Sequence, residues 1–295
     1  MLRSRYFDRL GFSDEEANAL SNNKPSKESL DKIMEAHLKE INFENLSQHG
    51  LPYAPSLDMK YTAKKVLDEQ RGGFCFELNG LLAELLLELG YNVKRVPAIV
   101  HVADIGFDHM PTHLVLVVSV PGKEDIEEWF VDVGFGEPAI HSLHYELSTV
   151  QQTPEGMTTR MVACPKDSDC AILEWKKEGL DDEHWVPRLK WKFQHPGQPL
   201  EEFQPALEEV LKETSIFHKK ALVVWIDRNQ KVSLSGTKWK RTSPRFGPNK
   251  QVTVKQFGSF DEVKEVLQKD FGVEAADKLI LTRSIEADPE VWDQF

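Results

Sequence analysis

One stretch of this chain restricts the possible folds more than any other: residues 71–79, Arg-Gly-Gly-Phe-Cys-Phe-Glu-Leu-Asn, which lead into a strongly patterned segment. Leucines recur there at intervals of three and four residues up to Leu89. This predicts a helix with one apolar face, and Gly90 is typical of a left-handed residue that ends a helix. Cys75 is expected in or just before the first turn. Unpaired backbone N–H groups and the positive end of the helix dipole favour a thiolate there, so Cys75 is a candidate nucleophile.

The position of Cys75 does not decide its role, because a lone cysteine is more often a small buried hydrophobic residue. Downstream, His113 begins an apolar run, and residues 129–133 form a second run after a break at Pro121. Two β-branched runs around a short polar loop predict an antiparallel hairpin, with His113 opening one strand and Asp132 in its partner. A cysteine, a histidine and an aspartate are the parts of a nucleophile, its base and the group that orients the base.

Five segments, in an order and at intervals typical of one family, resemble the arylamine N-acetyltransferases. The segments are Tyr6-Phe-Asp-Arg-Leu-Gly11, Ile41-Asn-Phe-Glu-Asn-Leu46, residues 71–79, Thr112-His113 and Val131-Asp-Val-Gly-Phe-Gly136. The resemblance covers most of residues 1 to about 240 and fades toward the C-terminus.

The resemblance implies transfer of an acyl group, in the first place acetyl, from an acyl-coenzyme A thioester to the nitrogen of an arylamine or hydrazine. Cys75 would be the nucleophile, His113 would take its proton, and Asp132 would fix the imidazole tautomer. Transfer through an acyl-cysteine predicts ping-pong kinetics. Some family members, notably in fungi, resemble enzymes adapted to malonyl-coenzyme A, so this donor stays open. Its extra carboxylate would need a cation or hydrogen-bond donors in the pocket.

Four residues beside the expected catalytic groups are predicted to bind the substrate: Phe74, Gly134, Phe135 and Gly136. Phe135 is expected to be a wall of the acceptor pocket, and the glycines beside it leave space for a thin ligand. In the family, a hydroxyl-rich stretch before a C-terminal strand helps to hold coenzyme A. Thr214 and Ser215 match that stretch loosely and are the predicted coenzyme A contacts.

Two further groups of polar residues are candidates for a role in the site. Glu44 lies among apolar residues, and a buried carboxylate needs a partner, for which Arg71 is the predicted one. We expect this pair to hold the glycine turn in place without taking part in the chemistry. His109 and His113 have a spacing that suits zinc on a helix, but Pro111 between them argues against a helix, so no metal is expected.

Composition narrows the class and the compartment. A net charge of -12 argues against nucleic acid as a general partner. Three cysteines form an odd, sparse set that suits a reducing compartment. The N-terminal residues lack an apolar signal core, and no segment approaches the length of a membrane span. We therefore expect a cytoplasmic protein without a membrane partner, monomeric or weakly homo-oligomeric.

The pattern of apolar residues predicts three domains in an α+β fold. Residues 1–90 are expected to form a helical bundle that carries the nucleophile, and His37 on one apolar helix face is expected to be a hydrogen-bonded core residue. Residues 91–195 are expected to form an antiparallel β-barrel-like domain that carries the His and the Asp. Residues 196–295 are expected to form an α/β lid. The resulting Cys-His-Asp core would resemble that of the cysteine proteases.

Two other functions remain compatible with the residues. A cysteine hydrolase of the papain or transglutaminase type uses the same three groups at the start of a helix, but needs no coenzyme A. A binding module would leave Cys75 buried and inert. Alkylation of Cys75 by iodoacetamide at neutral pH would argue against the binding module, because an ordinary thiol reacts slowly.

Overall fold

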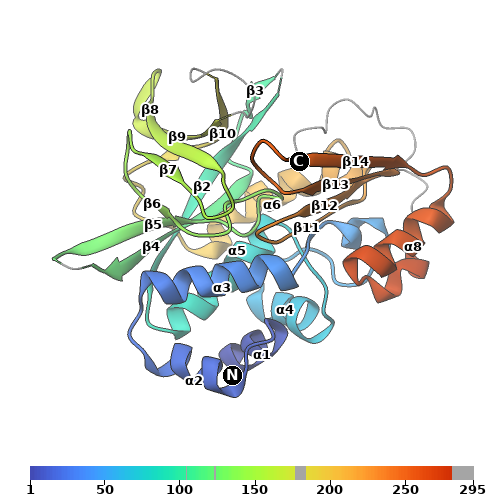
Figure 1. Cartoon of the computed structure of the whole chain (residues 1–295), viewed down its shortest axis with the longest axis horizontal. Coiled ribbons are helices and arrows are strands. Elements are labelled where there is room, and N and C mark those ends of the chain that lie inside the picture. Colours follow the sequence, from blue (N-terminus) through green and yellow to red (C-terminus); the bar gives the residue numbers. More distant parts are fainter. Residues whose placement is uncertain (104, 123, 177–183, 281–295) are drawn as a thin grey trace.

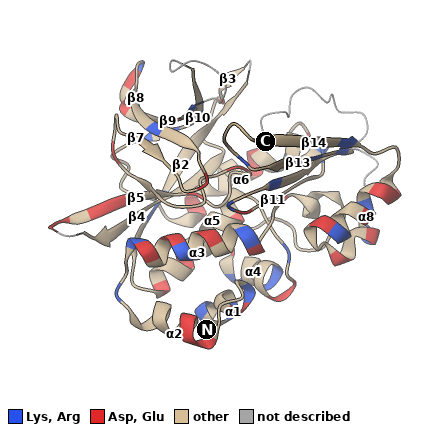
Figure 2. Cartoon of the chain, viewed as in Figure 1, with Lys and Arg blue, Asp and Glu red and all other residues tan. Residues whose placement is uncertain are grey.

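The computed structural model of this chain describes residues 1–103, 105–122, 124–176 and 184–280 (Figure 1). Helices of the N-terminal third lie on one side of the molecule, and two antiparallel sheets lie side by side on the other (Figure 1). Acidic residues are numerous on α2, α3 and α8 (Figure 2). The predicted α+β arrangement is confirmed, whereas the domain boundaries at residues 90 and 195 stay predictions.

Five α-helices form the N-terminal part: α1 (Leu2–Arg9), α2 (Asp14–Asn22), α3 (Lys27–Glu40), α4 (Met59–Ala63) and α5 (Cys75–Glu88). Short turns of 3₁₀ helix (Leu46–His49) and π helix (Lys64–Asp68) join them. Ser13 begins α2 with a capping box, and Ser26 caps α3 through the N–H of Ser29. As expected, His37 is fully buried on α3, with its Nδ1 2.6 Å from the hydroxyl of Tyr6.

The larger sheet is antiparallel and curls into a nearly closed barrel, with strand order β6-β5-β4-β2-β10-β9-β8-β7 and β3 paired to β2. Its strands are β2 (Asn92–Val102), β3 (Gly106–Phe107), β4 (His113–Pro121), β5 (Ile126–Val131), β6 (Leu143–His144), β7 (Val150–Gln152), β8 (Thr158–Cys164), β9 (Asp167–Lys176) and β10 (Trp185–Lys192). The predicted hairpin of β4 and β5 is confirmed, but β5 ends at Val131, one residue before Asp132. Asp132 therefore begins the following loop.

Strand β4 is buried on both of its faces. It packs against the helical part on one face and against the barrel interior on the other. Leu114, Leu116 and Val118 pack into the core that contains α5, whereas Val115 and Val117 pack into the interior of the barrel. Successive side chains of a strand point to opposite faces, so one continuous apolar run serves both cores. This double burial fixes the register of β4.

The smaller sheet has strand order β1-β11-β12-β13-β14 and combines residues that are far apart in the sequence. Its strands are β1 (Phe43–Glu44), β11 (Leu222–Ile226), β12 (Lys231–Ser235), β13 (Lys238–Ser243) and β14 (Gln251–Gln256). The C-terminal helices are α6 (Gln204–Leu211), α7 (Ile216–Lys219) and α8 (Phe260–Phe271), and a 3₁₀ turn spans Glu274–Lys278. Because β1 belongs to the N-terminal part, this sheet is not built from the C-terminal residues alone. Within the described residues, no helix has both the length and the apolar character needed to cross a membrane.

Candidate active site

Cys75 is the first residue of α5, as expected, and 5% of it is exposed. The turn before it is bound to β1, since Glu44 N donates to the carbonyl of Gly73 over 2.8 Å and Gly73 N donates to that of Asn42 over 3.3 Å. A Cβ atom at Gly72 would lie 2.0 Å from the carbonyl oxygen of Asn42, so this position admits only glycine. The turn therefore fixes where the helix begins.

The predicted pair of Arg71 and Glu44 is confirmed. Nε and Nη2 of Arg71 donate to Oε1 of Glu44 over 3.0 and 2.7 Å, and both side chains are buried. Burial opposes the charge on Glu44, but Arg71 and the nearby Lys65 outweigh it and keep the pKa of this carboxyl below its usual value. The second oxygen of Glu44 accepts from Leu46 N. The pair thus joins the glycine turn to β1 in a fully hydrogen-bonded arrangement.

A second buried ion pair, which no local sequence pattern predicts, supports the start of α5. Nζ of Lys65 lies 2.9 and 3.1 Å from the two oxygens of Glu77, and each side chain is 1% exposed. Glu77 also accepts from Phe74 N over 3.3 Å, as the third helical residue of a capping box does. Burial raises the pKa of Glu77, against the opposing effect of Lys65.

His113 and Asp132 form a buried hydrogen-bonded pair. Nε2 of His113 lies 2.8 Å from Oδ2 of Asp132, and 3% and 4% of the two residues are exposed. Oδ1 of Asp132 accepts from Gly134 N and from Nδ2 of Asn79, each over 2.8 Å. The carboxylate is therefore held on both oxygens, and the imidazole keeps Nδ1 for another partner.

Asn79 is a site residue that the sequence reasoning did not assign. Its amide nitrogen also donates to the carbonyl of Leu114 over 2.6 Å, and its oxygen accepts from Val133 N over 2.8 Å. Asn79 lies four residues after Cys75, one helical turn further on the same face. An asparagine on an otherwise apolar helix face was the available signal.

The charge state of His113 depends on its two neighbours. Burial is the largest single influence and disfavours the imidazolium. Asp132 and Cys75 together outweigh it, by charge and by hydrogen bonding, and raise the pKa of His113 to about 10. The ring is therefore protonated at neutral pH, between a carboxylate and a sulfur atom.

Gly134 lies directly against the nucleophile. A Cβ atom at this position would lie 2.5 Å from Cα of Cys75 and 3.1 Å from Nδ2 of Asn79. Next to it, Phe135 is 5% exposed, and its ring makes an edge contact with His113 at a centroid distance of 5.3 Å. The loop after Asp132 thus forms one side of the site.

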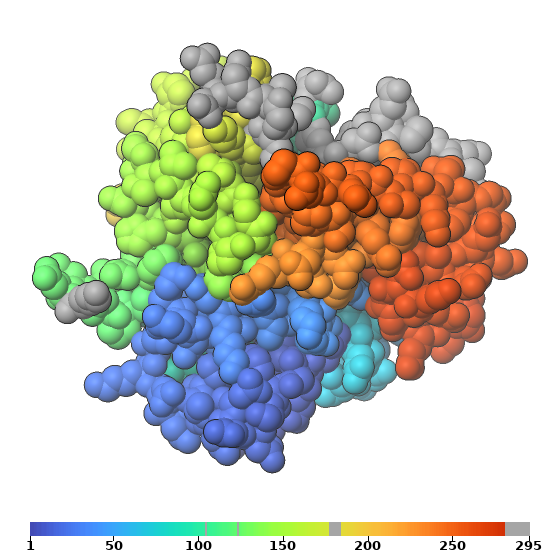
Figure 3. All heavy atoms as spheres, in the orientation of Figure 1, coloured from blue at the N-terminus to red at the C-terminus, as the bar shows by residue number. Residues whose placement is uncertain are grey.

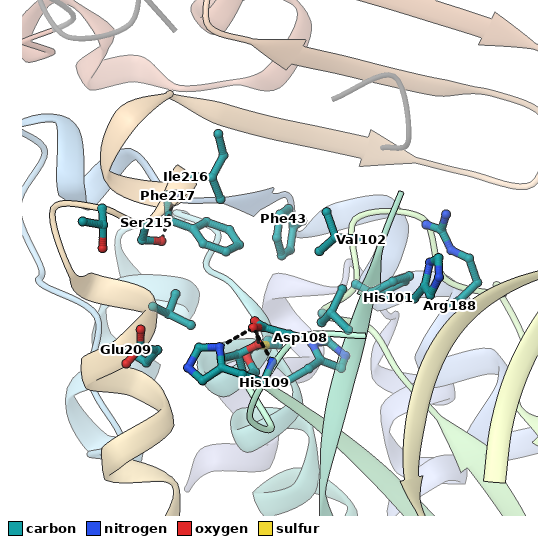
Figure 4. Close-up of a pocket in the computed structure, with 18 residues that line it drawn as sticks. Phe43, His101, Val102, Asp108, His109, Arg188, Glu209, Ser215, Ile216 and Phe217 are labelled. Atoms are coloured by element: carbon teal, nitrogen blue, oxygen red, sulfur yellow. Dashed lines mark hydrogen bonds and ion pairs between the residues drawn. The ribbon is translucent and has the colours of Figure 1, made fainter. Parts of the chain in front are cut away.

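Cys75, His113, Gly134 and Phe135 open into a cavity of about 280 Å³ between the barrel, β1 and the segment from α6 to α7 (Figure 4). The lining residues are Phe43, Cys75, Val100, His101, Val102, Asp108, His109, Thr112, His113, Gly134, Phe135, Arg188, Glu209, Val210, Thr214, Ser215, Ile216 and Phe217. The cavity is mostly apolar, with a few polar groups, which is typical of a small-molecule site.

The structure brings most of the predicted site residues to this cavity, but not all of them. Thr214 and Ser215 line it, and the hydroxyl of Ser215 also accepts from Phe217 N at the start of α7. Phe74 is fully buried and does not line the cavity, because its ring stacks on that of Phe217 at a centroid distance of 5.7 Å. Gly136, at φ +74°, does not line the cavity, and neither does Asp132, which is hydrogen-bonded to His113.

Arg188 is the most informative lining residue that the sequence analysis missed. It is 7% exposed, and its guanidinium carbon lies 4.2 Å from the ring centroid of Trp175 and 5.1 Å from that of Phe135. A basic residue in an ordinary strand carries no local signal for such a position.

His109 and Asp108 also line the cavity, with Nδ1 of His109 2.7 Å from Oδ1 of Asp108. Among the described residues, no group of three or more His, Cys, Asp or Glu is arranged to hold a metal ion.

Comparison with known proteins assigns this chain to one family. A sequence model of the family described as N-acetyltransferase matches residues 27–280, which is most of the chain. Among curated proteins, the arylamine N-acetyltransferase of Mycolicibacterium smegmatis is 40% identical over 136 residues, 44% of this chain and 48% of that protein. The chain belongs to the arylamine N-acetyltransferase family.

Solved structures extend the similarity over nearly the whole chain. The arylamine N-acetyltransferase of M. smegmatis has a TM-score of 0.77 at 27% identity, over 92% of both chains. The structure of Mycobacterium marinum arylamine N-acetyltransferase in complex with CoA has a TM-score of 0.78 at 25% identity, over 95% of this chain and 96% of that one. By sequence, the chain spans about half the length of the curated relatives it matches.

Proposed function

We propose that this protein transfers an acyl group from acyl-coenzyme A to the nitrogen of an arylamine or hydrazine, through a thioester on Cys75. The observation that carries the proposal is that His113, hydrogen-bonded to the buried Asp132, lines the same cavity as Cys75. Family membership supports the reaction class, and the coenzyme A complex of the M. marinum relative supports the nature of the donor.

In the first half-reaction, the thiolate of Cys75 attacks the carbonyl carbon of the donor thioester. The imidazolium of His113 balances the charge of the thiolate and then gives its proton to the departing coenzyme A thiol. Backbone N–H groups at the start of α5 would stabilise the tetrahedral oxyanion, an interaction whose loss typically costs about 3 kcal/mol. One thioester replaces another, so this step is nearly balanced in free energy.

In the second half-reaction, the amine attacks the acyl-cysteine. His113, now neutral, takes a proton from the nitrogen, and the thiolate leaves as the amide forms. Asp132 holds the ring so that Nδ1 faces the reacting groups in both steps. The first product leaves before the amine reacts. Double-reciprocal plots of initial rate against donor concentration, taken at several amine concentrations, should therefore be parallel, as in ping-pong kinetics.

Intact-protein mass spectrometry tests this proposal. The protein is mixed with acetyl-coenzyme A without amine, and we expect one acetyl group per chain, located on Cys75 by peptide mapping and released on addition of an arylamine. Cys75→Ala and Cys75→Ser should stay unmodified at this position. A native protein that never gains the acetyl group, or that transfers it while Cys75 is absent, would contradict the proposal. Cleavage of peptides without coenzyme A would instead favour a cysteine hydrolase.

One observation favours malonyl-coenzyme A as a second candidate donor. Arg188 lines the cavity together with Cys75 and is nearly fully buried. A cation in such a position suits a free carboxylate on the acyl group. A donor panel with one arylamine compares kcat/KM for acetyl-, propionyl- and malonyl-coenzyme A. If malonyl is the preferred donor, Arg188→Met should lower its kcat/KM by about tenfold or more and leave the acetyl value within about threefold.

A further inference from the structure

The loop that carries Gly134 and Phe135 is anchored at both of its ends. At its beginning, Asn79 of α5 binds Val133 N and the Asp132 carboxylate. At its far end, Glu137 and Pro138 meet side chains from the smaller sheet, which belongs to a different part of the molecule. In the space-filling view, this sheet, coloured orange, lies directly against the green segment that follows the loop (Figure 3).

The far anchor consists of one ion pair and one arginine. Nζ of Lys231, the first residue of β12, lies 2.5 Å from Oε2 of Glu137, and 6% and 20% of the two side chains are exposed. Arg245 is 1% exposed, and its Nη2 donates to the carbonyl of Pro138 over 3.1 Å. Its Nη1 donates to the carbonyl of Asp227 over 3.3 Å. Lys231 of β12 and Arg245, from the connection between β13 and β14, therefore bind two consecutive residues of the loop.

Both side chains of the Lys231–Glu137 ion pair are largely buried. Burial lowers the pKa of Lys231, whereas for Glu137 the charges of Lys231 and Arg245 outweigh burial and keep the pKa of this carboxyl below its usual value. A buried ion pair contributes little net stability, although removing one partner leaves an uncompensated charge. Such pairs are therefore better suited to fix a geometry than to stabilise a fold.

We propose that Lys231 and Glu137 are positioning residues that hold Phe135 as the wall of the acceptor pocket and so set the selectivity between large and small amines. Phe135 lies between the two anchors, touches the ring of His113 and lines the cavity. Without the far anchor, the loop would be tied at Asn79 and the ring would be held only by its contacts with His113, Trp175 and Arg188. The inference rests on the proposed function in that it takes the cavity to be the amine site.

The selectivity between a large and a small acceptor amine reports the position of the Phe135 ring. With acetyl-coenzyme A as donor, kcat/KM is compared for p-toluidine, which is wide enough to touch the wall, and for hydrazine, which is not. Lys231→Met and Glu137→Gln should lower the toluidine value by about tenfold and leave the hydrazine value within about twofold. Lys231→Arg, which keeps a cation, should retain the native ratio of kcat/KM for p-toluidine to that for hydrazine. Arg228→Met removes an exposed ion pair with Glu35 from the same β11–β12 turn and serves as the matched control.

A cycle with Phe135→Leu tests whether the effect passes through this ring. In the Phe135→Leu background, Lys231→Met should not change the toluidine-to-hydrazine ratio further. Equal losses for both amines in folded variants, no loss for either, or full additivity in the cycle would overturn the inference. If Lys231→Met does not fold, Glu137→Gln, which keeps the shape and a hydrogen-bond acceptor for Lys231, gives the same comparison.

Alkylation of Cys75 supplies a readout that needs no acyl transfer. The ratio of the rates with N-phenylmaleimide and iodoacetamide reports the width beside Cys75, and it should change by about fivefold in both anchor variants. A native protein that acetylates neither amine would refute the proposed function, whereas the alkylation ratio would still decide this inference. An unchanged ratio would overturn it.

Discussion

Nε2 of His113 and Oδ2 of Asp132 lie 2.8 Å apart in the interior of the protein, although 19 positions separate them in the chain. The carboxylate is the main reason why the imidazole keeps its proton despite being buried. His113 begins β4 and Asp132 follows β5, so the pairing of these strands brings the carboxylate to the imidazole and determines its charge. The role of Asp132 is therefore directly testable.

Asp132→Asn should leave the fold intact and lower acylation of Cys75 at neutral pH by about 10³-fold or more. An asparagine can still accept from Asn79 and Gly134, but its amide then donates to Nε2 and places the ring proton on Nδ1, the wrong tautomer for a base. Single-turnover acylation, followed by mass spectrometry, measures the effect. Asp169→Asn, in an exposed part of β9, is the control. Acylation within about tenfold of the native rate would contradict the assigned role.

The stability of the protein should reflect the same proton. The pKa of His113 is raised from 6.5 to about 10, so its contribution to the free energy of unfolding is complete below pH 6.5 and disappears as the pH rises to about 10. The stability difference between the native protein and Asp132→Asn should therefore shrink by about 1.4 kcal/mol per pH unit in this window. Urea unfolding at pH 6.5, 8 and 9.5 measures it, and a difference that stays constant would contradict the raised pKa.

His37 should show the opposite dependence. Burial, helped by Arg9, lowers the pKa of His37 to about 3, so the ring is neutral in the fold and takes up a proton on unfolding below pH 6.5. His37→Asn keeps an acceptor near the hydroxyl of Tyr6 and costs stability through lost packing. The loss in free energy of unfolding of this variant, relative to the native protein, should be about 1.4 kcal/mol smaller at pH 5.5 than at pH 7.5. Parallel stability curves for the two proteins would show that His37 is not held neutral.

Arg71→Lys should destabilise the protein more than it affects the chemistry. A lysine cannot reproduce the donors that Arg71 directs to Glu44, Ser47 and the carbonyl of Pro52, so we expect a loss of about 2–4 kcal/mol in the free energy of unfolding. The folded fraction should keep kcat within about tenfold. Arg5→Lys, in an exposed pair with Asp68, is the matched control and should cost less than about 0.5 kcal/mol. Unchanged stability in Arg71→Lys would refute the supporting role.

Gly134→Ala should reduce transfer by at least about 100-fold, because the new methyl group would lie 2.5 Å from Cα of Cys75 and displace the nucleophile or the loop. Gly258→Ala is the control, since the nearest atom to its Cβ would be 3.9 Å away. Steady-state kinetics and thermal unfolding separate lost activity from lost stability. An active Gly134→Ala variant would mean that the loop does not pack against the helix as described.

Local patterns were enough for the elements on which the site is built. The spacing of leucines predicted α5 with Cys75 at its start, and two β-branched runs predicted the hairpin of β4 and β5. The carboxylate at position 44 and the guanidinium at position 71 could be paired because a buried charge needs a partner. Phe74 was expected at the cavity, whereas it packs one layer behind, since neighbours of a nucleophile on a helix point in different directions.

The sequence by itself determined which residue begins the helix, which apolar runs form the hairpin and where glycine is required, because these depend on neighbours along the chain. Only the tertiary structure decided that Arg188 faces the cavity, that Asn79 binds the Asp132 carboxylate and that Lys231 reaches Glu137 across 94 positions. Such contacts depend on strand register and on how separate elements pack, and no local pattern of residues encodes the distance between surfaces that meet only when the chain has folded.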